Sequence, residues 1–330
     1  MKINKNGNMK QTILGAGGSI GIELAKALKE YTSDIRLVNR NPKKVNSADT
    51  LFPADLTVRE DIFKAIEGSG ITYVTIGFPY KTEVWEQTWI PFIQNVIAAC
   101  LEYNSKLLFF DNVYAIGGNN IIHITENSPI SPTSKKGKIR AEVDRLILES
   151  IDKNNLQAII ARAPDFFGGT AKANSIVINL VYDNLAKGKK AQWFCNSKVV
   201  HSMGFVPDLA KGTALLGNTQ EAYNQIWNLP TDPQRITGEE WINLFATELK
   251  KGNKHIVLPN WLVSGIGLFL PIMKELAEMN YQYDRDYYFD STKFNSYFKF
   301  TPTSNAVAVK QAIEQLKYTS KTDDKRTTTR

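Results

Sequence analysis

Three glycines at a fixed spacing follow the first apolar segment of this 330-residue chain. Residues 12–14 form a short apolar run, and Gly15, Gly18 and Gly21 come directly after it. A segment with helical periodicity then continues to about Glu30. A short strand, a glycine turn and a helix in this order are typical of the first unit of an α/β sheet.

Strand and helix patterns alternate through the first half of the chain. Strands are expected at residues 12–14, 35–38, 49–55, 71–76, 107–110 and 157–161, and further helices at 59–67, 84–103 and 135–150. The alternation predicts an α/β fold with a Rossmann-type doubly wound parallel sheet. Beyond Gly168 it gives way to separate helices at 175–187, 238–250 and 305–316, which predicts a smaller mixed α/β C-terminal lobe.

The glycine spacing indicates what the turn binds. A diphosphate carries two negative charges and must come within hydrogen-bonding distance of backbone amides, which side chains at the contact points would prevent. Glycine allows the sharp turn, the approach of the phosphates and close packing of the helix. The sequence therefore predicts a dinucleotide site at Gly15, Gly17, Gly18, Ser19, Ile20 and Gly21. The alternative is a flexible turn without a ligand.

The end of the second strand distinguishes NAD from NADP. Proteins that bind NAD usually carry Asp or Glu there, which accepts hydrogen bonds from the ribose 2′-hydroxyl. This chain has Asn39 and Arg40, and a guanidinium suits a 2′-phosphate. NADP is therefore the expected cofactor, with NAD as the alternative. The other interpretation is that Arg40, Lys43 and Lys44 form a solvated face of a loop.

Composition narrows the partners and the compartment. With 43% hydrophobic and 22% charged residues, the chain is typical of a globular protein. The net charge is +7, but the basic residues are scattered, so we expect a small-molecule substrate and no nucleic acid. Cys100 and Cys195 lack metal-ligand spacing, so we expect no metal site. Residues 1–10 lack the apolar core of a signal peptide, so we expect a cytoplasmic protein. The sequence leaves the oligomeric state open, and a homodimer is one possibility.

Two C-terminal segments are compositionally distinct. Trp261 to Met273 is almost wholly apolar, but a bilayer takes about 20 residues and Pro271 interrupts the run. We interpret it as a buried helix or an exposed apolar patch without stable membrane insertion, and a membrane-touching role is the alternative. Residues 318–330 are polar and rich in Thr, which predicts a disordered tail.

From about Lys10 to Lys317 the chain resembles the extended short-chain dehydrogenase/reductase superfamily, the NAD-dependent epimerase/dehydratase group. The segments that carry the resemblance are Asp55-Leu56, Gly77-Phe78-Pro79-Tyr80, Asp111-Asn112-Val113-Tyr114, Arg162 to Gly168, and His201 to Ala210. The resemblance implies that Asp55 and Leu56 lie near the adenine and that Gly77, Phe78 and Pro79 pass the cofactor. It also implies a cofactor domain of residues 10–168 with 199–230, and a substrate lobe of 169–198 with 231–317.

The same resemblance implies an altered catalytic centre. In the superfamily a Tyr and a Lys four residues later share one helix face; the Tyr moves the proton while hydride moves, and the Lys lowers its pKa. The matching positions here hold Lys136 and Arg140, and Asp111 replaces the usual Ser or Thr after the fifth strand. The chain is therefore similar to an atypical extended subgroup that lacks the catalytic Tyr.

Four residues are candidates for the chemistry: Asp111, Tyr114, Lys136 and Arg140. Tyr114 follows the fifth strand at the carboxyl edge of the sheet, where ligands bind, but a packing role, as in the Val-Tyr-Gly turn of the superfamily, is favoured over a catalytic one. Asp111 is interpreted as a base, an orienting group or a cap of the next turn. Lys136 and Arg140 share a helix face and either hold an anionic substrate or the nicotinamide ribose, or form a solvated basic helix start.

Two functions follow from these residues. The first is an NADP-dependent oxidoreductase or epimerase that uses a non-standard acid/base on an unidentified small molecule. The second is a catalytically degenerate NADP-binding sensor or protein-interaction module. Only the first predicts substrate-dependent oxidation of the cofactor.

Overall fold

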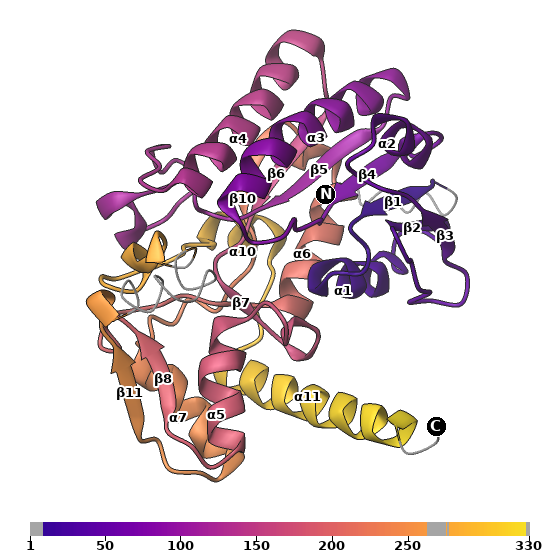
Figure 1. Ribbon diagram of the computed structural model, residues 1–330. Coiled ribbons are helices and arrows are strands. Elements are labelled where there is room, and N and C mark those ends of the chain that lie inside the picture. Colours follow the sequence, from indigo (N-terminus) through magenta and orange to yellow (C-terminus); the bar gives the residue numbers. More distant parts are fainter. Residues whose placement is uncertain (1–8, 263–274, 276, 328–330) are drawn as a thin grey trace. The chain divides into compact units, whose positions relative to one another are not determined.

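The structure is a computed structural model that describes residues 9–262, 275 and 277–327, with residues 319–327 described by their backbone alone. It divides into two compact units (Figure 1). The first unit comprises Met1–Gly118, Glu126–Ala163 and Leu209–Leu229, and the second comprises Asn119–Thr125, Pro164–Asp208 and Pro230–Arg330. These bounds differ from the predicted ones mainly because residues 119–125 and 199–208 belong to the second unit.

A seven-stranded parallel sheet forms the centre of the first unit. Its order is β3 (Thr50–Pro53), β2 (Ile35–Asn39), β1 (Gln11–Leu14), β4 (Ile71–Val74), β5 (Lys106–Asp111), β6 (Ala158–Arg162) and β10 (Gln225–Asn228). All neighbouring strands run parallel, and Leu14 of β1 stands opposite Val38 and Val74. The first six strands are the predicted ones, whereas β10 was not predicted.

Helices cover both faces of this sheet (Figure 1). Helices α2 (Arg59–Ile66), α3 (Thr82–Glu102) and α4 (Lys135–Asn154) lie on one face, and α1 (Ser19–Leu28) and α6 (Val206–Gly217) lie on the other. Ile62, Val96 and Ile147 of the first three helices share a buried core with strand residues such as Leu107 and Ile160. The arrangement confirms the predicted Rossmann-type doubly wound sheet.

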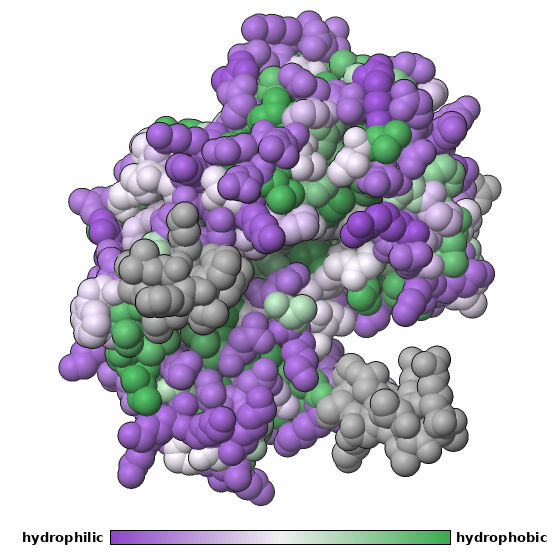
Figure 2. All heavy atoms as spheres, viewed as in Figure 1, coloured by the Kyte–Doolittle hydropathy of each residue, from purple (hydrophilic) through white to green (hydrophobic). Residues whose placement is uncertain are grey.

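The ends of helix α4 are fixed by local chemistry. The Ser134 side chain accepts a hydrogen bond of 3.0 Å from the amide of Gly137, which caps the helix start. Asn155 ends the helix in the left-handed region at φ +58°. The outer surfaces of α3 and α4 are mostly hydrophilic (Figure 2), and Arg145 of α4 pairs there with Glu142. Lys136 and Arg140 therefore lie in the first turns of a well-defined helix.

The second unit combines short strands and helices. Strand β8 (Ala191–Phe194) pairs with β11 (His255–Leu258), and β7 (Phe166–Phe167) pairs with β9 (Gly204–Phe205), both in parallel. The helices with described bounds include a π-helix (Ile178–Tyr182), α5 (Asp183–Ala186), α7 (Gly238–Leu249), α10 (Thr292–Phe298) and α11 (Asn305–Thr327). Short 3₁₀ helices are η1 (Gly118–Ile122), η2 (Gly169–Ala171) and η5 (Asn280–Gln282) here, and η4 (Gln220–Ala222) in the first unit. This is the mixed α/β lobe that the sequence predicts.

Aromatic side chains fill the core of the second unit. The rings of Phe167 and Trp241 meet edge to face with centroids 5.2 Å apart. Trp193 from the segment 192–194, and Tyr287 and Phe289 from the segment 281–289, are buried. These aromatic segments therefore supply core packing.

Two C-terminal predictions meet the structure differently. Helix α11 continues from Asn305 to Thr327 and so covers most of the segment 318–330 that we predicted to be a disordered tail. The chain has neither proline nor glycine after Pro302, so no residue type that breaks helices stops it. The apolar segment 261–273 lies outside the described residues from 263 onward. Among the helices that are described, none combines the length and apolar character that crossing a bilayer requires.

Candidate functional site

The packing of the chain itself requires glycine at two positions of the turn between β1 and α1. Gly15 has φ +96°, and a Cβ there would lie 2.5 Å from the backbone of Ile76. A Cβ at Gly21 would lie 2.7 Å from the carbonyl oxygen of Gly15 and 2.8 Å from Cα of Ala16. The sharp turn and the close approach of α1 therefore both depend on the missing side chains.

Gly18 differs from these two glycines. A Cβ at Gly18 would come no closer than 3.5 Å to another atom, the carbonyl oxygen of Gly15, and its φ of −79° suits any residue. The packing of the chain itself therefore does not require glycine here. The first amide hydrogen bond of α1 runs from Ile22 to Gly18, so the amides of the first helical turn have no acceptor inside the helix. A bare backbone beside such amides fits a diphosphate.

The end of β2 lies beside this turn. A Cβ at Gly17 would lie 2.7 Å from the amide nitrogen of the Asn39 side chain. Arg40 is exposed, and within the described part of the chain its guanidinium makes no hydrogen bond or ion pair. Asp55 is also exposed; hydrogen bonds from Thr57, and to a smaller extent the charge of Arg40, lower the pKa of its carboxyl group. The two opposite charges therefore lie close enough to interact, next to the end of β2.

Two of the predicted cofactor residues are held by the core. The Leu56 side chain is buried in the core between the sheet and helices α2 to α4. The Phe78 ring packs edge to face on Trp89 and Phe92, with centroids 4.9 and 5.4 Å away. Gly77 is exposed, and a Cβ there would meet nothing within 4 Å. The loop after β4 thus presents a bare backbone beside an anchored ring.

Asp111 and Arg140 form a buried ion pair at the end of β5. Nε of Arg140 donates to Oδ1 of Asp111 at 2.6 Å, and a second nitrogen contacts the same oxygen. The two residues are 0% and 3% exposed, respectively. The guanidinium also lies 4.3 Å from the ring centroid of Trp89 and 4.6 Å from that of Phe109. Arg140 is therefore held by one carboxylate and two aromatic faces.

A second buried ion pair, between Asp144 and Arg162, was not predicted. Their side chains meet at 3.0 Å and are both nearly inaccessible. Burial, and then the nearby charge of Asp111, raise the pKa of Asp144 to about 8. The spacing of four residues between Arg140 and Asp144 is a signal in the sequence that both face the same way.

Lys136 and Tyr114 meet at a third residue, Tyr80. Nζ of Lys136 lies 4.6 Å from the centroid of the Tyr80 ring and donates to Oγ1 of Thr82 at 3.1 Å. The Tyr80 hydroxyl donates to the Tyr114 hydroxyl at 3.4 Å. Sequence reasoning missed Tyr80 as a candidate for chemistry, although it follows directly on the predicted cofactor loop.

Two of the alternatives for these residues are wrong. Lys136 is 0% exposed, so α4 does not begin as a solvated basic face. The turn after β5 is capped by Asn112, whose side-chain oxygen accepts from the amide of Tyr114 at 2.9 Å, rather than by Asp111. The four predicted residues thus form two groups, Asp111 with Arg140, and Tyr114 with Lys136.

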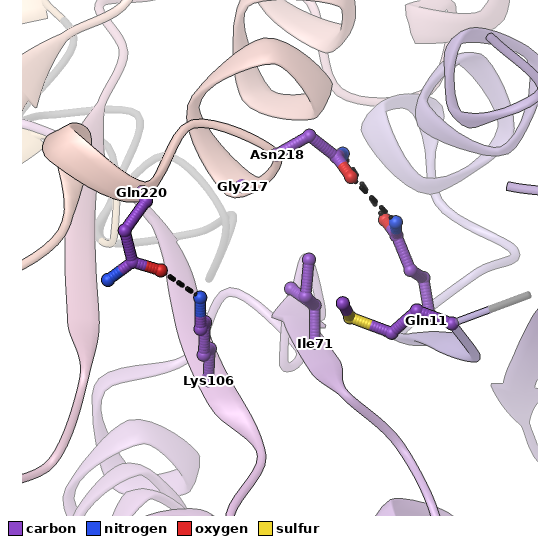
Figure 3. A pocket seen from close by; sticks show the side chains of 7 residues that line it. Gln11, Ile71, Lys106, Gly217, Asn218 and Gln220 are labelled. Atoms are coloured by element: carbon purple, nitrogen blue, oxygen red, sulfur yellow. Dashed lines mark hydrogen bonds between the residues drawn. The ribbon is translucent and has the colours of Figure 1, made fainter. Parts of the chain in front are cut away.

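A small cavity lies at the opposite edge of the sheet. This cavity of about 10 Å³ lies where β1, β4 and β5 begin, lined by residues that include Gln11, Ile71 and Lys106 (Figure 3). Gln11 donates to Asn218 across it at 2.8 Å. Such a cavity holds one water molecule at most. In the described residues of the chain, no cluster of three His, Cys, Asp or Glu side chains is placed to hold a metal ion.

A match to a protein-family model shows which family the chain belongs to. The model of the NAD dependent epimerase/dehydratase family matches residues 12–229, which is more than half of the chain. The chain belongs to this family. The resemblance that the glycine turn and the later motifs carry is thereby confirmed, and no protein of curated function matches the chain by sequence.

Several solved structures share the fold of this chain. The chain matches gox2253 at 19% identity with a TM-score of 0.76, covering 94% of this chain and 98% of that one. It matches the UDP-glucose 4-epimerase of Thermus thermophilus in complex with NAD at 14% identity and TM-score 0.74, over 94% and 99% of the two chains. The UDP-glucose 4-epimerase of Thermotoga maritima with UDP-glucose matches at 15% and 0.76, over 94% and 99%. At these identities the likeness concerns the fold.

Proposed function

We propose that this family member binds NADP and acts as an NADP-dependent oxidoreductase or epimerase on a small molecule. The observation that carries the proposal is the end of β2. Asn39 lies beside Gly17 there, and the guanidinium of the exposed Arg40 makes no hydrogen bond or ion pair with the described part of the chain. A guanidinium in this position suits a 2′-phosphate, and no carboxylate occupies the position to bind a ribose 2′-hydroxyl.

The residues proposed to hold the dinucleotide surround the glycine turn. They are Gly15, Gly17, Gly18, Ser19, Ile20 and Gly21, with Asn39, Arg40, Asp55, Leu56, Gly77, Phe78 and Pro79. Amides at the start of α1 bind the diphosphate. Leu56 and Phe78 contribute through their backbone, because their side chains belong to the core. When bound, the nicotinamide ring supplies or accepts a hydride.

Tyr114 is the residue proposed to move the proton. Chemistry at a carbon–oxygen bond needs a group that gives a proton to the substrate oxygen or takes one from it. Tyr114 is half-buried and follows β5 at the carboxyl edge of the sheet, where ligands of such sheets bind. Asp111 and Arg140 are too deeply buried to touch a substrate, so we assign them to positioning the end of β5. Lys136 contributes its positive charge next to Tyr80.

The burial of two cations favours the second candidate function, a cofactor-binding sensor without turnover. Lys136 and Arg140 are 0% and 3% exposed, and each is engaged inside the protein. They stand where the resemblance implies catalytic residues, and neither side chain faces solvent. Turnover separates the two candidates: a carbonyl substrate that oxidises bound NADPH supports the enzyme, and NADPH binding without turnover on any carbonyl supports the sensor.

Calorimetric titration with NADPH and with NADH tests the proposal. Arg40→Ala is expected to weaken NADPH binding by roughly 10- to 100-fold and to leave NADH binding unchanged, because it removes charged hydrogen bonds to one phosphate. Lys43→Ala removes the same charge from an exposed position of the same loop and is the matched control, with little effect expected. Tighter binding of NADH than of NADPH by the unmodified protein contradicts the proposal.

A further inference from the structure

The loops that follow β4 and β5 bring two tyrosine hydroxyls together. The Tyr80 hydroxyl donates to the Tyr114 hydroxyl at 3.4 Å. Both residues are half-buried, so neither is sealed off from solvent. Neighbouring parallel strands end at the same edge of a sheet, and this edge is the one that carries the glycine turn. The hydroxyl pair therefore lies on the edge where a ligand is expected.

A tryptophan of α3 holds both rings. The Tyr114 ring stacks on Trp85, with centroids 6.3 Å apart and planes inclined by 19°. The Tyr80 ring meets the same indole edge to face, at 5.7 Å and 82°. Trp85 itself is buried in the core of the first unit. The orientation of the two hydroxyls is therefore set by a rigid helix rather than by the loops alone.

A buried cation lies on the same pair. Nζ of Lys136 is 4.6 Å from the centroid of the Tyr80 ring and 3.1 Å from Oγ1 of Thr82. An ammonium group that is 0% exposed is costly unless it is compensated, and an aromatic face and a hydroxyl compensate it in part. A positive charge in this place also stabilises negative charge on a neighbouring phenol oxygen.

We propose that Tyr80, Tyr114 and Lys136 form a proton relay, in which Tyr114 is the catalytic acid or base, and Tyr80 and Lys136 are positioning residues that act through it. The inference rests on the proposed function. In the reductive direction, bound NADPH would supply the hydride to the substrate carbon, while the O–H bond of Tyr114 breaks and its proton passes to the substrate oxygen. The proton of Tyr80 then moves to the Tyr114 oxygen, and Tyr80 takes up the one net proton of the reaction from bulk solvent. Lys136 stabilises the phenolate while it exists.

The relay assigns a specific role to a buried lysine on α4. The ammonium group does not touch the substrate. Its charge acts on the tyrosine pair that two loops of the sheet edge supply. The relay therefore predicts that the tyrosines and the lysine respond together when any one of them is changed.

Absorbance titration of tyrosinate in the cofactor-free full-length protein tests the relay without any reaction. Lys136→Met is expected to raise the pH of tyrosinate formation by about one pH unit for the signal that Tyr80→Phe and Tyr114→Phe remove. Lys138→Met, at an exposed position of the same helix, is the matched control and is expected to change nothing. Equal titrations of the two lysine variants overturn the relay, whether or not the protein turns over a substrate.

Steady-state kinetics provide the second test, and they distinguish failure of the relay from failure of the proposed function on which it rests. With a substrate in hand, Tyr114→Phe is expected to lower kcat by roughly 100-fold or more, and Tyr80→Phe by roughly 10-fold with KM unchanged. Tyr80→Phe keeps the ring that packs on Trp85, so its melting temperature is expected to stay close to that of the unmodified protein. Turnover that is unaffected by Tyr80→Phe overturns the relay and leaves the proposed function standing. Failure to bind any nicotinamide nucleotide overturns the proposed function itself.

Discussion

Asp111 and Arg162 stand directly opposite each other across strands β5 and β6, and helix α4 supplies a partner of opposite charge to each. Arg140 pairs with Asp111, and Asp144, one turn later, pairs with Arg162. Acidic and basic side chains therefore alternate in a buried layer between the sheet and α4. A buried charged group is costly unless it has a partner. This cluster ties α4 to the ends of the strands that precede the candidate site.

Removing one charge from this cluster should destabilise the fold. Arg140→Met keeps much of the side-chain volume against Trp89 and Phe109 but leaves Asp111 buried without its partner. The free energy of unfolding is expected to fall by about 3–5 kcal/mol, as measured by urea unfolding. Arg145→Met, on the exposed side of the same helix, is expected to leave the unfolding midpoint nearly unchanged. Equal effects of the two substitutions would show that the buried pair contributes no more than a surface pair.

The raised pKa of Asp144 predicts a pH dependence of stability. The carboxyl group has an ordinary pKa of 3.8, and burial first and the charge of Asp111 second raise it to about 8 in the folded chain. Between these values the folded state holds a proton that the unfolded state releases. The stability that this group contributes is therefore complete below about pH 4 and declines as pH rises to about 8, by at most about 1.4 kcal/mol per pH unit.

Asp144→Asn isolates this effect, because the amide does not titrate. Urea midpoints measured between pH 5 and pH 8 are expected to decline less steeply in Asp144→Asn than in the unmodified protein. Glu142→Gln, a partly exposed position of the same helix, should retain the original slope. An unchanged slope in Asp144→Asn would mean that Asp144 stays ionised in the folded state.

The sequence predicts the strands and helices of this protein better than it predicts the burial and partners of its charged side chains. The six strands from residue 11 to residue 162 are apolar runs separated by helical segments, and such a pattern specifies a parallel sheet. Strand β10 carries no such signal, because Gln225–Asn228 is short and half polar, and only its pairing with β6 makes it a strand. Local sequence does not contain that tertiary contact.

The same limit explains the charged residues on α4. A run that begins Lys135-Lys136-Gly137-Lys138 is expected on a solvated face, yet Lys136 is wholly buried. Its burial depends on Tyr80 and Thr82, which lie more than fifty residues earlier in the chain. Arg140 is likewise buried because β5 ends in a carboxylate at Asp111. Periodicity identifies which residues share a helix face, but it does not identify the residues of other elements that contact that face.

The residue at the end of β2 should determine the choice of cofactor. Asn39→Asp places a carboxylate beside Gly17, where it can accept hydrogen bonds from a ribose 2′-hydroxyl and repels a 2′-phosphate. Oδ1 of Asn39 accepts from the amide of Asn41 at 2.7 Å, and an aspartate oxygen preserves that bond. NADH affinity is expected to rise and NADPH affinity to fall, by roughly 10-fold in the ratio of the two. An unchanged ratio in calorimetric titration would indicate that this position does not contact the ribose.

The glycines of the turn should separate folding from binding. Gly21→Ala places a Cβ 2.7 Å from a backbone oxygen, so the protein is expected to lose stability and to melt at a lower temperature. Gly18→Ala meets no atom closer than 3.5 Å, so its melting temperature should match that of the unmodified protein. Its added methyl group would occupy the surface that the diphosphate approaches, so NADPH affinity is expected to fall at least roughly 10-fold. Thermal unfolding and calorimetric titration of both variants test this prediction. Normal NADPH binding by Gly18→Ala would show that the diphosphate does not bind at this turn.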